Sequence, residues 1–221
     1  MRPVRCVLFD FGNTLFGHRS LVETISSCSI ELGRPLDPAA ACQLAEEIDE
    51  AAHSPDELRR GRDLDADVWT SRWQVLYGIA DGVMPGLGRA VMNDMHAPHA
   101  WTPYSGTIAT LRQLRSCDTA VGVVSNTGWD IRSVIRAAGV ADCIDEFTLS
   151  CEIGLVKPDP AIFALACATL AADPAETLMV GDDPRADSGA VAAGLRALLL
   201  PPCAPGGDNG IESVVRIACS R

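Results

Sequence analysis

The chain begins with a short apolar run that ends abruptly in polar residues. Val4 to Phe9 is mostly apolar, and the turn after it carries a carboxylate, two turn-forming residues and a hydroxyl, in the order Asp10-Phe11-Gly12-Asn13-Thr14-Leu15. A run of this kind predicts a strand buried on both faces of a parallel sheet. Because a charged side chain is costly to bury there, we expect Asp10 at the carboxyl end of the strand, where ligands bind in open α/β sheets.

The periodicity then becomes helical from about residue 20 to residue 97. Helices are expected over 20–32, 37–51, 65–79 and 85–95. No alternating strand pattern interrupts them, so this segment predicts a compact helical insertion. Trp69 and Trp73 are expected in the core of the insertion rather than in a ligand-binding box.

From Trp101 onward, short apolar runs alternate with helical segments. Strands are expected over 120–124, 147–149, 178–180 and 196–200, and helices over 107–114, 130–138, 160–170, 187–193 and 211–218. Strands alternating with helices predict a parallel, doubly wound sheet with right-handed crossovers. We therefore predict an α/β protein with a three-layer Rossmann-like core, formed by 1–16 and 101–221, and an all-helical cap formed by 17–100.

Composition narrows the classes of function. The 221 residues carry a formal net charge of −11, which argues against a nucleic-acid partner because no basic patch can meet a phosphate backbone. Because no apolar stretch is long enough to cross a membrane and the first strand starts early, we expect neither a membrane span nor a secretion signal. Nine scattered cysteines, none in a CxxC pair, predict reduced and mostly buried thiols in a cytoplasmic protein.

Polar residues that suit one chemistry follow the predicted strands. They are Asp10, Ser125, Asp182 with Asp183, and Lys157, the only lysine of the chain, in a long loop after the strand over 147–149. Carboxylates gathered at one sheet edge need a cation, and oxygen ligands with space for water suit Mg²⁺. A hard dication beside an ammonium and a hydroxyl makes a phosphate site, since phosphoryl transfer needs mainly positioning and charge.

The order of these motifs resembles the haloacid dehalogenase-like superfamily, specifically its members with a helical C1 cap. The matching segments are Asp10 to Leu15, Ser125-Asn126, Gly154 to Pro160, and Gly181-Asp182-Asp183 followed by Asp187. The resemblance implies a Mg²⁺-dependent phosphatase. Such an enzyme would act on a small phosphorylated metabolite through an aspartyl-phosphate intermediate.

The resemblance also implies a role for each matching residue. Asp10 would be the nucleophile, Lys157 would neutralise the nucleophile and the transferred group, and Ser125 would anchor a phosphate oxygen. Mg²⁺ would be held by Asp10, Asp182 and the backbone carbonyl of Gly12. Asp187, or Asp183, would hold the water shell of the metal or Lys157. The substrate would be bound by Gly12, Asn13, Thr14, Ser125, Asn126 and Lys157.

One position departs from the family pattern. Most phosphatases of the family carry a second Asp two residues after the nucleophile, where this chain has Gly12. The side chain of that Asp protonates the leaving oxygen and later activates water. Glycine still offers a carbonyl to the metal but no acid or base, and general acid-base catalysis is typically worth about 10²–10⁴-fold in rate. His18, just past the turn, is a candidate replacement because imidazole titrates near neutral pH. Asn13 after Gly12 tolerates the left-handed backbone that the turn needs.

Several arginines of the insertion could hold the distal part of a substrate, although exposed arginines on helices are commonly just solvated. They are Arg19, Arg59, Arg60, Arg62 and Arg72.

Two other interpretations stay open. The loss of an acid at position 12 also fits a non-catalytic protein that keeps the fold to bind a phosphate or a partner. A 2-haloacid dehalogenase of the same fold would use Asp10 on carbon and need no metal. Family dehalogenases tend to have an aromatic residue where this chain has Gly12, and Ser-Asn where it has Gly181-Asp182, so both departures argue against that activity.

Overall fold

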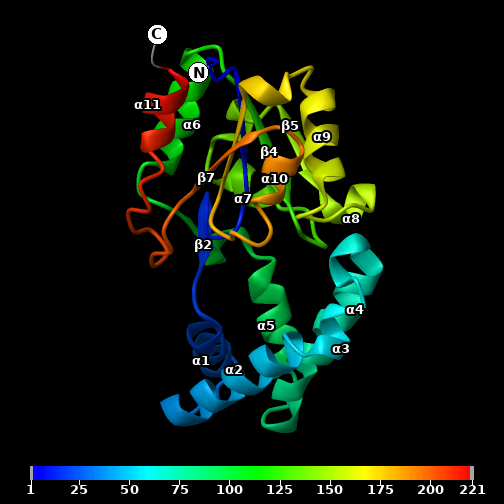
Figure 1. Cartoon of the computed structure of the whole chain (residues 1–221). Coiled ribbons are helices and arrows are strands. Elements are labelled where there is room, and N and C mark those ends of the chain that lie inside the picture. Colours follow the sequence, from blue (N-terminus) through cyan, green and yellow to red (C-terminus); the bar gives the residue numbers. More distant parts are fainter. Residues whose placement is uncertain (1, 220–221) are drawn as a thin grey trace.

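The computed structural model describes residues 2–219 and has a five-stranded sheet at its centre, in the order β5-β4-β1-β6-β7 (Figure 1). Its strands are β1 (Cys6–Phe9), β4 (Ala120–Ser125), β5 (Glu146–Leu149), β6 (Thr177–Gly181) and β7 (Arg196–Leu199). Every pairing between neighbours is parallel. The carboxyl ends of β1, β4 and β6 therefore meet at one edge, and the predicted α/β fold is confirmed.

Helices cover both faces of this sheet. They are α6 (Thr107–Ser116), α7 (Arg132–Ala137) and α11 (Ser213–Ala218) on one face, and α9 (Pro160–Thr169) and α10 (Gly189–Ala192) on the other. Alternate residues of β1 serve the two layers: Val7 and Phe9 pack in the cluster with α6, α7 and α11, whereas Cys6 and Leu8 pack with α9 and α10. The central strand is therefore buried on both faces, as its unbroken apolar run predicts.

The insertion between β1 and β4 is helical. Its elements are α1 (Leu21–Glu31), α2 (Pro38–Ala52), α3 (Pro55–Leu58), α4 (Ala66–Tyr77) and α5 (Leu87–Met95), with 3-10 helices η1 (Arg62–Leu64) and η2 (Gly78–Gly82). Ser20 starts α1 through a capping box with Glu23, and Asp37 caps α2. Of these helices, α1, α2, α4, α5 and η2 contribute to a hydrophobic cluster of the insertion, and all the helices of the insertion lie together at one end of the molecule (Figure 1). The exact domain boundaries stay a prediction.

Two short strands connect this helical cap to the core. Residues of β2 (Phe16–His18) pair antiparallel with those of β3 (Trp101–Pro103), and β3 follows the 3-10 helix η3 (Pro98–Ala100). The sequence analysis did not predict this pair, because three residues are too few to show an alternating pattern. It also expected a long loop after β5, where the structure has the short helix α8 (Ser150–Ile153). The remaining 3-10 helices are η4 (Ala141–Cys143) and η5 (Pro174–Glu176).

The expectation that all nine cysteines are reduced is wrong for two of them. Cys117, at the end of α6, forms a disulfide with Cys219, at the end of α11, with a Cα–Cα distance of 6.0 Å. The two are 102 residues apart, so their packing together depends on the fold and leaves no local spacing motif. Of the seven free cysteines, four are buried, namely Cys6, Cys28, Cys143 and Cys167. Within residues 2–219, no helix is both long and apolar enough to span a bilayer.

Candidate active site

The turn after β1 presents Asp10 at the carboxyl edge of the sheet. The backbone N–H of Asp10 still donates to the carbonyl of Val180 at 2.9 Å, so its position is fixed by the neighbouring strand β6. Asn13 has a φ of +56°, the left-handed conformation expected for it. The N–H of Asn13 donates to the carbonyl of Phe16 at 2.9 Å, which closes the turn.

Lys157 lies between two carboxylates. Its Nζ is 2.8 Å from Oδ1 of Asp10 and 2.7 Å from Oδ1 of Asp187. Burial opposes a charge on Lys157, but the two carboxylates outweigh it and raise the pKa of the ammonium group. The chain therefore holds its only lysine as a cation directly against the predicted nucleophile.

The side-chain amide of Asn126 fixes the backbone of Lys157 from both directions. Its Nδ2 donates to the carbonyl of Lys157 at 2.9 Å, and its Oδ1 accepts from the N–H of Lys157 at 2.8 Å. Asn126 directly follows β4, so this pair joins two of the motifs found in the sequence. Its amide therefore positions the lysine, in addition to any contact with a substrate.

Asp187 is fully buried and both of its carboxylate oxygens have partners. Oδ1 accepts from Lys157, while Oδ2 accepts from the N–H groups of Asp182 and Asp183 at 3.1 Å each. Only glycine fits at position 181, because a Cβ there would lie 2.0 Å from Oδ2 of Asp187. Of the two roles considered in the sequence analysis, the water shell of the metal and Lys157, these contacts favour the second, because one oxygen of Asp187 is bound to Lys157 and the other to two backbone N–H groups.

Thr14 is also fully buried, and its Oγ1 donates to Oδ1 of Asp182 at 3.0 Å. Thr14 was predicted to bind substrate, but this contact makes it a support for the carboxylate of Asp182. The turn after β1 and the turn after β6 are thus joined through one hydroxyl group.

The acidic residues at this edge fit a divalent cation. One carboxylate oxygen from each of Asp10, Asp182 and Asp187 lies within 4.8 Å of the others. Burial raises the pKa of Asp10 to about 6, despite the opposing effect of Lys157, and burial also raises the pKa of Asp182. A hard cation bound by these oxygens would offset that cost. Asp10 and Asp182 would be its side-chain ligands, with the carbonyl of Gly12 beside them.

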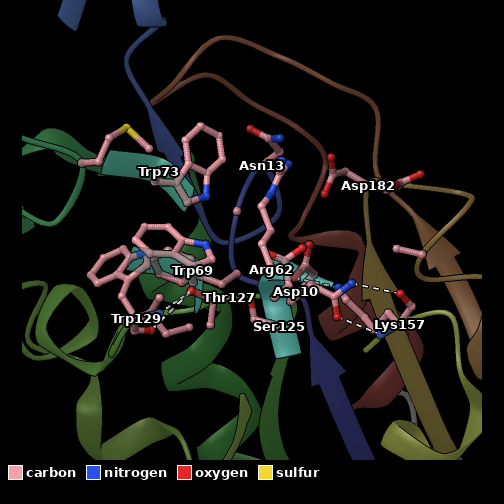
Figure 2. Close-up of a pocket in the computed structure, with 18 of the residues that line it drawn as sticks. Asp10, Asn13, Arg62, Trp69, Trp73, Ser125, Thr127, Trp129, Lys157 and Asp182 are labelled. Carbon is pink, nitrogen blue, oxygen red and sulfur yellow. Dashed lines mark hydrogen bonds and ion pairs between the residues drawn. The ribbon is translucent and has the colours of Figure 1, made fainter. Parts of the chain in front are cut away.

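A pocket of about 720 Å³ opens above Asp10, between the core and the cap. Most of the predicted site residues line it together, namely Asp10, Gly12, Asn13, Ser125, Asn126, Lys157 and Asp182. Figure 2 shows Asp10, Lys157 and Asp182 on one side of this pocket and three tryptophans on the other. The convergence of distant strand ends on one pocket is the arrangement expected for a ligand site in an open α/β sheet.

The sequence analysis missed much of the far side of the pocket. All four tryptophans of the chain line it, namely Trp69, Trp73, Trp101 and Trp129, together with Asp63, Met95 and Thr127. Trp69 also belongs to the core cluster of the cap, as expected, so it serves both the packing and the pocket. Trp129 closely follows Ser125 in the chain, a proximity that could have marked it as a pocket residue.

His18 lies at the hinge and is not one of the residues that line this pocket in the described chain. Its Nδ1 is 2.6 Å from the carbonyl of Arg19, and its Nε2 is 3.5 Å from Oδ2 of Asp94. Its ring also packs edge-on against Trp101, with 5.1 Å between the ring centroids. Burial lowers the pKa of His18. These contacts tie the hinge to α5, and the imidazole faces Asp94 and Trp101 instead of the pocket that Asp10 lines.

Among the arginines of the cap, Arg62 reaches the pocket. Its guanidinium lies 4.8 Å from the ring centroid of Trp73 and donates to the carbonyl of Ala52 at 2.8 Å. Arg62 also lies 3.9 Å from Oε1 of Glu57, and the other arginines pair with carboxylates as well: Arg19 with Asp94, Arg59 with Asp56, and Arg60 and Arg72 with Glu57.

Comparisons with known proteins find similarity to both dehalogenases and phosphatases. (S)-2-haloacid dehalogenase 1 of Pseudomonas sp. (strain CBS-3) is 24% identical over 214 residues, which cover 90% of this chain and 86% of that protein. Glyceraldehyde 3-phosphate phosphatase of Methanothermobacter thermautotrophicus is 27% identical over 205 residues, which cover 89% and 85%. The crystal structure of a HAD phosphatase from Thermococcus onnurineus superposes with a TM-score of 0.65 at 21% identity, covering 97% of each chain.

The family model of haloacid dehalogenase-like hydrolases matches residues 4–194. This match spans β1, the cap and the turns that carry Ser125, Lys157 and Asp182, so it includes every element of the site described above. The chain belongs to the haloacid dehalogenase-like hydrolases.

Proposed function

We propose that this hydrolase is a Mg²⁺-dependent phosphatase, which cleaves a small-molecule phosphate monoester through an aspartyl-phosphate on Asp10. One observation carries the proposal: Asp10 contacts Lys157 at 2.8 Å and shares a group of carboxylate oxygens, all within 4.8 Å of one another, with Asp182 and Asp187. An ammonium group and an oxygen-rich cation site on one nucleophilic carboxylate are what phosphoryl transfer requires.

Each residue of the chain has a physical task in this reaction. An oxygen of Asp10 attacks phosphorus, and the adjacent ammonium of Lys157 keeps that carboxylate ionised despite its burial. Ser125, at the end of β4, and the N–H groups of the turn would hold the phosphoryl oxygens. Bound Mg²⁺ would neutralise the charge of the phosphate and of Asp182.

Haloacid dehalogenation is the second candidate, and it has one observation in its favour. The pocket is lined by four tryptophans, and an apolar lining suits a short haloacid as well as it suits a phosphate ester with an apolar group. Two residues argue against it. Gly12 stands where family dehalogenases tend to have an aromatic residue, and Asp182 adds a carboxylate near that of Asp10, so that the pair needs a cation. The non-catalytic interpretation depends on Gly12 alone. A location in the cytoplasm stays a prediction from the sequence.

The test is release of inorganic phosphate from an activated aryl phosphate and from a panel of phosphometabolites, with Mg²⁺ and with EDTA. We expect the wild type to release phosphate in the presence of Mg²⁺ and not in the presence of EDTA. Asp10→Asn should release no phosphate under either condition. Asp142→Asn is the matched control, because Asp142 is exposed and precedes β5 at the opposite edge of the sheet. Halide release from a 2-haloacid without metal, and no phosphate release, would favour the dehalogenase instead. Release of neither would favour the binding protein.

A further inference from the structure

A phosphatase with glycine at position 12 needs an acid from elsewhere. In an in-line displacement the attacking and leaving oxygens lie on opposite sides of phosphorus. Since Asp10 attacks from the sheet, the leaving oxygen departs toward the cap. A residue that protonates it must therefore lie on the part of the pocket that the cap contributes.

Asp63 is a carboxylate in that position. It belongs to η1 in the cap and lines the same pocket as Asp10, Gly12 and Ser125. It also lines an adjoining pocket of about 170 Å³ together with Asn126 and Lys157. Two separate cavities thus place this cap residue next to the motifs of the core.

The core holds the backbone of Asp63 in place. Oγ of Ser150, the first residue of α8, donates to the carbonyl of Asp63 at 2.6 Å. The same oxygen accepts from the N–H of Thr127 at 2.9 Å, and Thr127 belongs to the loop that begins at Ser125. Through these two hydrogen bonds, η1 of the cap is fixed to the loop that would anchor the phosphate.

The carboxyl group of Asp63 is otherwise uncommitted. Within residues 2–219, neither of its oxygens has a hydrogen bond or an ion pair, and the side chain is half-buried. The charged or titratable residues that share a pocket with Asp63 are Arg62 and His53 of the cap and Asp10, Lys157, Asp182 and Asp183 of the core, while Glu152 of α8 pairs with Arg132. Burial raises the pKa of Asp63 against the opposing charge of Arg62, which favours the protonated form that an acid catalyst needs.

We propose that Asp63 is the general acid and base that position 12 does not provide. The inference rests on the proposed phosphatase function. As Asp10 bonds to phosphorus, the bond from phosphorus to the leaving oxygen breaks, and that oxygen takes the proton of the Asp63 carboxyl group. Water then attacks phosphorus and gives a proton to the Asp63 carboxylate, while the bond between phosphorus and Asp10 breaks. Inorganic phosphate leaves, and both carboxyl groups return to their starting states.

The test compares leaving groups in Asp63→Asn. Asparagine keeps the size of the side chain and the backbone contact with Ser150, but it cannot give up a proton. For an alkyl phosphate with a poor leaving group, kcat/KM should fall by about 10²–10⁴-fold. For a nitrophenyl phosphate, whose leaving oxygen needs no proton, it should change little. In the wild type, the rate on the alkyl phosphate should fall at alkaline pH, because Asp63 loses the proton that it gives to the leaving oxygen. This fall should be absent from Asp63→Asn. Asp67→Asn is the matched control, because Asp67 is exposed on α4 nearby.

A second variant separates chemistry from structure. A Cβ at Gly12 would meet no atom within 4 Å, so the backbone has space for a side chain there, and Gly12→Asp restores the family's usual acid. Added to Asp63→Asn, it should recover the rate on the alkyl phosphate. An equal loss on both substrates without this rescue would overturn the proposal, and so would an unchanged rate on the alkyl phosphate. If the wild type releases phosphate from neither ester, the proposed function itself fails, and the inference with it.

Discussion

Trp69 of the cap packs directly on the backbone of Gly128 in the core, where a Cβ would lie 1.9 Å from Cγ of the indole. Gly128 belongs to the loop that follows Ser125 at the end of β4. At this contact the indole meets the backbone of the loop directly, because glycine has no side chain. The size of residue 128 therefore sets how closely the cap approaches the phosphate-anchoring part of the site.

Gly128→Ala should displace the cap. Because the added methyl group overlaps the indole, we expect a loss of up to about 10²-fold in kcat/KM, the scale of a 1 Å misplacement. Overpacking should also lower the free energy of unfolding by about 1–3 kcal/mol. Steady-state kinetics on an aryl phosphate and urea denaturation measure the two effects. Gly82→Ala is the control, since a Cβ there meets nothing within 4 Å. Equal behaviour of the two variants would show that the contact does not position the cap.

Asp187→Asn should destabilise the fold as well as inactivate the enzyme. It leaves Lys157, only 5% exposed, with one carboxylate partner instead of two. Breaking a buried ion pair in this way costs about 3–5 kcal/mol. The exposed pair of Arg2 and Asp173 provides the comparison, and Asp173→Asn should cost about 0–1 kcal/mol. Similar unfolding free energies for the two variants in urea would contradict the structural role given to Asp187.

Trp73→Leu should affect substrates according to their distal group. The indole lines the pocket away from Asp10, so it can contact a ring on the substrate but not a phosphate alone. An aromatic pair is worth about 0.5–1.5 kcal/mol, which corresponds to a loss of up to about tenfold in kcat/KM for an aryl phosphate. Acetyl phosphate is the control substrate and should be hydrolysed at an almost unchanged rate. Equal losses on both would mean that Trp73 only supports the packing of the cap.

His96 should make stability depend on pH. It lies between Trp69 and Trp129, with ring centroids 5.3 Å and 5.2 Å away, and burial lowers its pKa. The unfolded chain then binds the proton more readily, so this contribution to stability is lost as the pH falls below the unfolded value of about 6.5. The raised pKa values of Asp10 and Asp182 act in the opposite direction, so only a difference between variants isolates the effect.

The measurement for His96 is the free energy of unfolding at about pH 7.5 and about pH 5.5, on either side of the unfolded pKa. His96→Phe should lose less stability over this interval than the wild type does. The exposed His99, changed to Phe, is the control and should follow the wild type. If the free energy of unfolding of His96→Phe changed with pH as steeply as that of the wild type, groups other than His96 would cause the pH dependence.

The sequence predicted the core side of the site because the relevant signal is local. Asp10, Ser125 and Asp182 each end a buried strand, and parallel strands bring such ends to one edge whatever their distance in the chain. Lys157 was found because a lone lysine in an Arg-rich chain, set in a Lys-Pro-Asp-Pro segment, is conspicuous. Side-chain direction was less predictable: Thr14 has a hydroxyl suited to phosphate, but its rotamer turns it toward Asp182.

The cap side could not be predicted in this way. Asp63 lies in a 3-10 turn, where no period separates inward from outward residues. Its place in the pocket depends on how the cap docks, which Ser150 and Gly128 determine from the core. The pairing of Cys117 with Cys219 likewise arises only when α6 and α11 pack side by side.

The central claim is that Asp10 becomes phosphorylated during turnover. Wild-type protein should be mixed with an aryl phosphate and Mg²⁺, quenched in acid within the first turnovers, digested and analysed by mass spectrometry. The account predicts one phosphoryl group on Asp10, absent after EDTA and absent from Asp10→Asn. Phosphate release with Asp10 unmodified, or with the phosphoryl group on another residue, would contradict it.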